Sequence, residues 1–272
     1  MKLATGTVVL VLLSAMFCVA QQLPVGTILP VALSTAINAD KAKAGERISG
    51  KLAQYVVVDG TRLPRGTKVT GRIVAARPAS AASPSRVTFV FDTIRIGNRD
   101  LPITTSLRAL ASMQEVFEAQ LPTNTIDDYG SSIRDWNTLQ VGGQEVYRGD
   151  GTVIEGREVV GKASIVGEVV GKPKTWSWSP CERDQASNTV QSFWVFSTDA
   201  CGIYGFEGLK LAHAGRSEPP GEIVLESAGK LNVRAGSGLL LMVTSSVQQP
   251  QTAPASGHIA LSSGSIEAAT QR

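Results

Sequence analysis

Histidine is scarce in this chain of 272 residues, which holds only two. His258 lies in a C-terminal segment (245–272) of Ser, Gln, Ala and Pro that has too few large apolar residues to offset its ordering entropy, so we predict a disordered tail there. His213 is then the only candidate general base. A lone histidine is usually a surface or capping residue, and a zinc site needs three or four converging ligands. We therefore predict no catalytic residue, no metal site and no cofactor.

The sequence also lacks the short motifs of common enzymes. It has no Gly-x-Ser-x-Gly nucleophile elbow and no phosphate-binding Gly-x-x-x-x-Gly-Lys-Ser/Thr loop. Its densest acidic positions are Asp127-Asp128 and the pair Glu115 and Glu118. Sugar hydrolases use two carboxylates several ångströms apart, but proximity in sequence does not show convergence in space. We predict that the protein is not an enzyme, and an uncharacterised hydrolase is the alternative.

Net charge is small, because 26 basic residues face 23 acidic ones. A nucleic-acid-binding domain usually shows a clear basic excess. We therefore predict no nucleic-acid partner.

Long apolar runs are missing beyond the first twenty residues. These begin with Lys2, continue through an apolar run from Val8 to Leu13, and end in the small-residue pattern Cys18-Val19-Ala20. That order is typical of a secretory signal peptide, here cut after Ala20. A membrane anchor is the alternative, although a spanning helix needs about 20 apolar residues. Lipidation at Cys18 is rejected because the bulky Phe17 precedes it. We predict export to the periplasm or the extracellular space, with no integral membrane segment after cleavage.

Cysteine is nearly absent as well, with three residues in all. Cys18 would leave with the signal peptide, so Cys181 and Cys201 remain as a pair. In an oxidising compartment such a pair predicts a disulfide. Closing a loop of about twenty residues would stabilise the fold by about 3 kcal/mol in the chain-entropy model. Two unpaired buried thiols are the alternative.

Alternating apolar and polar residues indicate half-buried strands at residues 47–52, 68–73 and 86–89. Asp59-Gly60 and Gly97-Asn98 lie between such runs, where tight turns need left-handed backbone angles. The pattern predicts a mainly β protein with an antiparallel barrel or sandwich that has one solvated face.

A single short helix is predicted from Ser106 to Gln120. Its apolar residues recur at three- and four-residue spacing, and Pro122 follows to end it; they are Leu107, Leu110, Met113, Val116 and Phe117.

Aromatic residues are few, and seven gather between residues 176 and 206, around the two cysteines; they are Trp176, Trp178, Phe193, Trp194, Phe196, Tyr204 and Phe206. Trp176 and Trp178 alternate at period two, as on one face of a strand. Exposed rings of this kind stack on sugars or anchor protein partners. We therefore take Trp176, Trp178, Trp194 and Tyr204 as candidate ligand- or partner-binding residues. The alternative is a small core around the disulfide.

Three segments carry a family resemblance: "LPVGTILPVALSTAINADKAKAGERISGKLAQ", "LPRGTKVTGRIV" and "VTFVFDTIRIGNRDLPI". They resemble the TrbI-like β-barrel domain of conjugation and type IV secretion scaffold proteins, with a Pro-x-Gly-Thr opening, an Ala-Ile-Asn segment and a second Pro-x-Gly-Thr. The late segment "LNVRAGSGLLLMV" looks like that family's closing strand. Gly26 and Gly66 each follow a proline turn and permit backbone angles that start a strand.

The resemblance covers about residues 23–106 and 222–244, and it implies a barrel and an envelope location. The chain departs from the family in having a cleavable signal in place of the inner-membrane helix, and a polar region in place of the membrane-crossing segment. The expected organisation is a signal peptide (1–20), a first part of the barrel (21–106), an aromatic, disulfide-containing insertion (107–221), closing strands (222–244) and the tail (245–272).

The function expected from these features is that of an exported cell-envelope structural or interaction protein. Its partner would be an envelope protein or a glycan. A carbohydrate-binding module that uses the aromatic cluster at 176–206 is the alternative, and the sequence leaves oligomerisation open.

Overall fold

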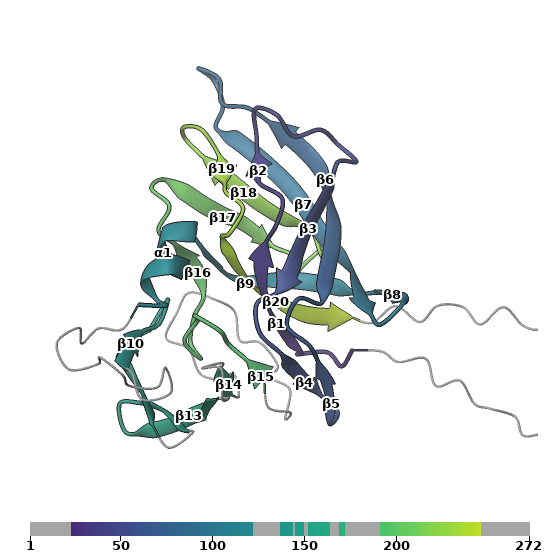
Figure 1. The fold of residues 1–272 in the computed structure, drawn as a ribbon. Coiled ribbons are helices and arrows are strands. Elements are labelled where there is room, and N and C mark those ends of the chain that lie inside the picture. The colour runs from purple at the N-terminus through teal and green to yellow at the C-terminus, as the bar shows by residue number, and fades with distance from the viewer. Residues whose placement is uncertain are drawn as a thin grey trace, which may run out of the picture.

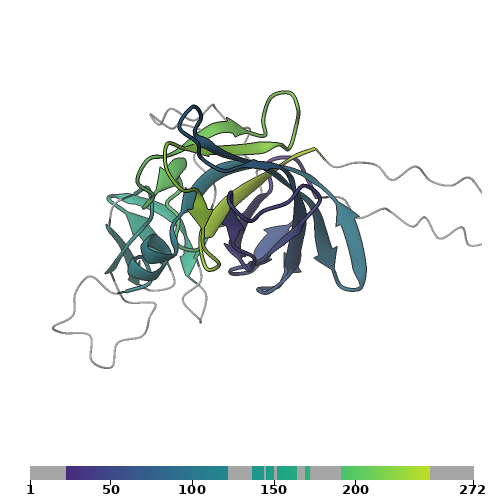
Figure 2. The same ribbon diagram turned by 90° about the horizontal axis from the view of Figure 1, so that it is seen from above.

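The protein is mainly β, as the sequence predicts, and its largest part is a nearly closed, barrel-like sheet. The computed structural model describes residues 23–121, 137–143, 145–149, 152–163, 169–171 and 191–245. Seen from above, the strands of the main sheet curve round a common interior (Figure 2).

Ten strands form the main sheet, and they are antiparallel except where β16 runs parallel to β9. In order across the sheet they are β16 (Gly202–Tyr204), β9 (Thr104–Ala111), β20 (Gly238–Ser245), β1 (Ile28–Leu33), β3 (Arg47–Leu52), β6 (Lys68–Arg77), β7 (Ser85–Ile96), β18 (Ile223–Ser227) and β17 (Leu209–Ala214), with β8 (Arg99–Pro102) paired to β7.

Smaller units flank this sheet (Figure 1). A six-stranded sheet contains β10 (Asn137–Leu139), β11 (Glu145–Gly149), β12 (Thr152–Glu155), β13 (Glu158–Ala163), β14 (Val169–Gly171) and β15 (Gln191–Ser192). Two short pairs are β2 (Ile37–Asn38) with β19 (Asn232–Val233), and β4 (Val56–Val58) with β5 (Thr61–Leu63).

The two Pro-x-Gly-Thr motifs form the same turn, as their sequence suggests. In each, the threonine N–H and hydroxyl both donate to the proline carbonyl, from Thr27 to Pro24 and from Thr67 to Pro64. Gly26 and Gly66 both have a φ of 86°, which suits the third position of a type II turn and favours glycine there. The next residues begin β1 and β6, so the prediction that these motifs start strands is confirmed.

Each of these turns also bonds to a neighbouring strand. Gly26 N–H donates to the Val243 carbonyl at 2.8 Å, and Gly66 N–H donates to the Leu52 carbonyl at 2.8 Å. The same arrangement recurs without proline before β3 and β20, at residues 43–46 and 234–237. The turns therefore fix the register of the barrel as well as reversing the chain.

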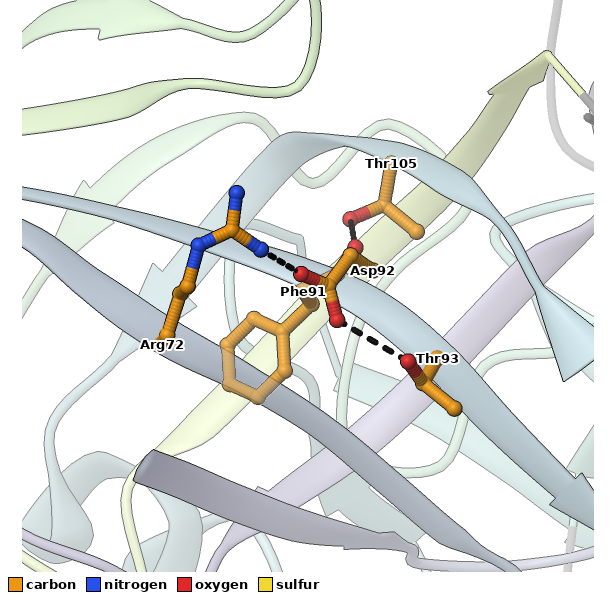
Figure 3. A network of polar contacts seen from close by, with 5 residues as sticks. All are labelled: Arg72, Phe91, Asp92, Thr93 and Thr105. Carbon is orange, nitrogen blue, oxygen red and sulfur yellow. Dashed lines mark hydrogen bonds and ion pairs between the residues drawn. The ribbon is translucent and has the colours of Figure 1, made fainter. Parts of the chain in front are cut away.

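Two hydrogen bonds join the start of β9, and the residue before it, to β7, and so connect the two sides of the curved sheet. The Thr105 hydroxyl donates to the Phe91 carbonyl at 2.9 Å, and the Ile103 N–H donates to the Asp92 carbonyl at 2.9 Å. Figure 3 shows Thr105 reaching Phe91 next to the ion pair between Arg72 and Asp92. β7 and β9 are joined by these individual hydrogen bonds and not by a continuous strand ladder. The barrel is therefore nearly closed and not fully closed.

The strands β9, β20 and β1 are buried on both faces. Leu239, Leu241 and Val243 point into the core inside the barrel, whereas Leu240 and Met242 belong to a second core on the outside. A strand buried on both sides has an almost continuous apolar sequence instead of an alternating one.

That double burial explains an error in the helix prediction. Residues 106–111 are part of β9, and the helix α1 covers only Met113–Glu118. Leu107 and Leu110 lie in the barrel core, so their three-residue spacing did not reflect a helical face. The sequence between 106 and 111 lacks the period of a half-exposed strand because both of its faces are covered.

Strands of the main sheet also occur inside the range predicted as an insertion, 107–221. The end of β9, then β16 and β17, all lie in it and pair with other strands of that sheet. The sheet therefore does not stop at residue 106 or restart at residue 222. The predicted tail from 246 onward, the predicted signal peptide at 1–20 and residues 122–136 lie outside the described residues.

A prediction concerns Gly71, where the backbone of β7 leaves no room for a side chain on β6. A Cβ at this buried glycine would overlap the Val90 carbonyl and the Phe91 backbone. We expect Gly71→Ala to lower the free energy of unfolding by about 1–3 kcal/mol in urea titrations, as overpacking does. Gly229→Ala is the control, because a Cβ there would meet nothing within 4 Å, and it should change stability by less than about 0.5 kcal/mol. Equal effects of the two substitutions would contradict the close approach.

Candidate functional site

Only part of the predicted aromatic site lies within the described residues. Trp176, Trp178 and Cys181 are outside them, so their binding and disulfide roles stay predictions. Trp194, Cys201 and Tyr204 are described, and all three lie beside the second core or near it.

Trp194 supports the fold from the edge of the second core. Its backbone has a φ of 56°, which is unusual for a non-glycine residue. The half-buried indole packs against that core and meets Phe196 edge to face, with ring centroids 6.4 Å apart. This orientation is typical of stabilising aromatic pairs.

Tyr204 also has a structural role. Its hydroxyl accepts a hydrogen bond from the Cys201 N–H at 2.9 Å and donates one to the Cys201 carbonyl at 2.7 Å. A Cβ at Gly142 would touch this same hydroxyl, so the phenol is enclosed. The polar end of Tyr204 is therefore engaged within the protein.

Cys201 is 8% exposed. Since Cys181 lies outside the described residues, the predicted pairing of these two cysteines stays a prediction.

A buried arginine ties the loop before Cys201 to the barrel. Arg108 on β9 is 5% exposed; its Nε donates to the Ala200 carbonyl and its terminal nitrogen to the Thr198 carbonyl, both at 3.1 Å. A buried charge is costly unless it is hydrogen-bonded, so these bonds hold the loop in one position. Arg108 was not singled out from the sequence.

The helix α1 is held next to this loop by its N-terminal cap and by its inner face. Ser112 caps it by accepting from the Glu115 N–H at 3.2 Å, and the Ser112 N–H donates to the Tyr204 carbonyl at 3.0 Å. Val116 and Ala119, three residues apart, are 6% and 5% exposed and belong to the second core. The helix is thus clamped at its start and along its inner face.

The outer face of α1 and the turn after it expose three large apolar side chains. Met113 is 44% exposed, Phe117 is 62% exposed and Leu121 is 46% exposed. Met113 and Phe117, four residues apart, lie on the same side of α1, and Leu121 follows in the turn after it. We call these three residues the α1 apolar row. The sequence predicted Met113 and Phe117 as members of the apolar face together with Val116. The structure turns them outward, because Val116 and Ala119 take the inner face.

A polar pair lies alongside this row. Gln114 donates to the Glu118 carboxylate at 2.9 Å, one helical turn along. Apolar residues with a polar margin are the usual composition of a protein interface.

The candidate catalytic groups show local structural contacts. His213 on β17 has Nδ1 2.6 Å from the Glu222 carbonyl and Nε2 2.8 Å from the Ser217 hydroxyl. Both contacts connect β17 with the chain leading into β18. Asp127 and Asp128 lie outside the described residues. In the part of the chain that is described, no three His, Cys, Asp or Glu side chains are grouped to hold a metal.

A hollow of about 330 Å³ opens at the end of the barrel where β2 pairs with β19. Ile48 and Ile73 are buried apolar residues on its lining, and the polar lining residues are Asn38, Lys41, Glu46 and Asn232. Glu46 is the single carboxylate among these lining residues, so the two carboxylates that a sugar hydrolase needs are not brought together here.

No family model matches this chain, and no curated protein matches it. Among the described residues, no helix combines the length and apolar character needed to cross a membrane.

A prediction separates a structural from a ligand-binding role for Tyr204. Tyr204→Phe removes the hydroxyl that bonds both backbone groups of Cys201. We expect a loss of about 1–2 kcal/mol in the free energy of unfolding, because these groups lose their partner without full access to water. Urea titration measures it. A stability within about 0.5 kcal/mol of the parent protein would contradict the structural role.

Proposed function

We propose that this protein is an exported, non-catalytic cell-envelope protein that binds another protein through the α1 apolar row. The observation that carries the proposal is the row itself, with three large apolar side chains 44–62% exposed on α1 and on the turn after it, where α1 is clamped at its cap and inner face. Holding them outward on a fixed base lowers the entropy lost on binding.

The partner we propose is a protein with an apolar groove and a basic margin. Helices that dock in grooves present anchors at four-residue spacing, as Met113, Phe117 and Leu121 do. Glu118 lies beside the row, and its half-buried neighbour Glu115 adds a second carboxylate. Phe and Met are also enriched at protein interfaces, where they fill pockets.

We further propose that the barrel is TrbI-like and that the protein works in the envelope. Support comes from the two Pro-x-Gly-Thr turns of equal geometry and from the pairing of β20, the closing strand, with β1. The signal-peptide pattern at residues 1–20 supports export. The burial of Cys201, which is 8% exposed, is compatible with a bridge to Cys181 in an oxidising compartment.

Glycan binding by the aromatic cluster is the second hypothesis, and it now depends on Trp176 and Trp178. Trp194 packs on the second core and Tyr204 uses its hydroxyl internally. Two of the four predicted rings therefore have structural contacts that compete with a role in stacking on sugar.

Export predicts a defined mature protein. We expect the purified native chain to begin at Gln21 by N-terminal sequencing and to contain no free thiol in a denaturing thiol assay. A chain that still begins at Met1 and shows free thiols would contradict both the export and the bridge.

Partner binding predicts a site-specific effect at Phe117. A photo-crosslinking residue at position 117 should capture one protein, identified by mass spectrometry. That protein, once purified, should bind the parent chain and bind Phe117→Ser at least tenfold more weakly in isothermal titration calorimetry, because truncating a central anchor typically costs 2 kcal/mol or more.

Val25→Ser is the matched control, because Val25 is 51% exposed on a turn of the barrel. It should leave the affinity for the partner unchanged within about twofold. If Val25→Ser weakens binding as much as Phe117→Ser does, or if neither weakens it, the α1 apolar row is not the binding surface.

A further inference from the structure

Charge is distributed unevenly along the chain, although the whole protein has a formal charge of only +3. Residues 40–100 contain twelve Lys and Arg but five Asp and Glu, which gives this stretch a formal charge of +7. The same stretch supplies β3, β6, β7 and the first half of β8. One side of the barrel therefore concentrates positive charge that the composition of the whole chain conceals.

The pairing of strands puts like charges directly opposite each other. Lys51 on β3 is the register partner of Lys68 on β6, and Arg47 is the partner of Arg72. On the other side of β6, Arg77 faces Arg86 of β7. All six side chains are exposed. Like charges at directly opposed positions destabilise a sheet. The stability of the fold therefore does not account for three such pairs along one strand, and a role in binding would.

Nearby carboxylates compensate only part of this charge. Arg72 pairs with Asp92 (Figure 3), and Arg86 pairs with Glu226 at 2.9 Å. Within the described residues, Arg47, Lys51 and Lys68 have no ion pair.

The positive charges of Lys68 and Arg47 also act on Asp100 in the hairpin formed by β7 and β8. Asp100 at its end accepts two hydrogen bonds from Arg95, at 2.7 and 2.8 Å. The hydrogen bond from Arg95 is the main cause that lowers the pKa of Asp100. Desolvation opposes it, and the charges of Arg95, Lys68 and Arg47 lower the pKa further, each by less than desolvation raises it. The cations on β3 and β6 therefore lie close enough to act on the same anion.

We propose that the outer face of β3 and β6 is a binding track for a linear acidic polysaccharide. The three cation pairs follow β6 from Lys68 to Arg77, over roughly 30 Å at the usual rise of a strand. Partly exposed hydroxyls of Ser49 and Thr70 lie between the first two pairs as register partners. The Lys and Arg side chains can bind the carboxylates of an acidic sugar chain, and the hydroxyls between them can form hydrogen bonds with its sugar oxygens.

The same face fits two other polyanions less well. Peripheral binding to an anionic membrane usually adds apolar side chains that enter the lipid, and the large exposed hydrophobic residues of the described chain lie outside β3, β6 and β7. Single-stranded nucleic acid binds through exposed aromatic rings, whereas the rings on these three strands, Phe89 and Phe91, are 1% exposed.

The middle cation pair of the track, Arg47 and Arg72, lies next to residues that line the hollow at the end of the barrel. Glu46 and Ile48 on its lining are the sequence neighbours of Arg47, and Ile73 is the neighbour of Arg72. The hollow next to this pair also presents Asn38, Lys41 and Asn232, whose polar groups suit sugar hydroxyls.

Lys51→Glu is the decisive variant, because it turns a like-charge pair into an opposite-charge pair with Lys68. We expect it to raise the midpoint of thermal unfolding while it weakens binding of polygalacturonate oligomers at least tenfold, measured by isothermal titration calorimetry in 150 mM salt. Lys230→Glu makes the same change of charge at an exposed position on the connection between β18 and β19, and it should weaken binding by less than twofold. Phe117→Ser should also leave this binding intact, so a failure of the track and a failure of the α1 apolar row are distinguishable.

The probes include dextran of equal length, single-stranded DNA of equal charge and vesicles of anionic phospholipid. Binding of polygalacturonate that exceeds binding of all three, together with selective loss in Lys51→Glu, supports the track. The proposal is overturned if polygalacturonate does not bind, if DNA or vesicles bind more tightly, or if Lys230→Glu weakens binding as much as Lys51→Glu. It is also overturned if Lys51→Glu lowers the unfolding midpoint, since the cations would then serve the fold.

Discussion

The burial of β9, β20 and β1 on both faces is the constraint on which the rest of the structure depends. Their inner side chains fill the barrel, and their outer side chains form the second core with Val116, Phe196 and Ala200. A sheet with only one covered face would leave Leu240 and Met242 in water, at a cost of about 25 cal/mol for each Å² of apolar surface. Covering them positions the loop held by Arg108, then α1, and through α1 the apolar row.

The barrel carries two unusual surfaces, the α1 apolar row and the cationic face of β3 and β6, and they have different physical origins. On the side of β9, apolar residues exceed what the second core can enclose, so Met113, Phe117 and Leu121 remain exposed. On the side of β3 and β6 no other described element covers the barrel wall, so its outward residues are polar, but the charged ones on these two strands all have a positive charge. Apolar exposure and unpaired like charge both cost stability, and proteins retain such features mainly where binding requires them.

The near-neutral net charge led to the prediction that there is no nucleic-acid partner, but a charge counted over the whole chain does not show how the charge is distributed. Electrostatic attraction depends on charges within about a Debye length, roughly 8–10 Å at physiological salt. Counting residues 40–100 separately would have revealed the excess of +7 from the sequence. The sequence could not show that Lys51 lies opposite Lys68 and Arg47 opposite Arg72, because these pairs depend on the register between β3 and β6.

The sequence by itself determined features whose causes lie within a few residues. The Pro-x-Gly-Thr turns at 24–27 and 64–67, the alternating strands such as 47–52, and the hairpin turns at Asp59-Gly60 and Gly97 all follow from local backbone preferences and period. Tertiary structure alone decided that 106–111 is a strand and that Met113 and Phe117 point outward, while Trp194 packs on a core. Those outcomes depend on which surfaces cover each side of β9 and α1, and these surfaces come from residues about a hundred positions away in the chain.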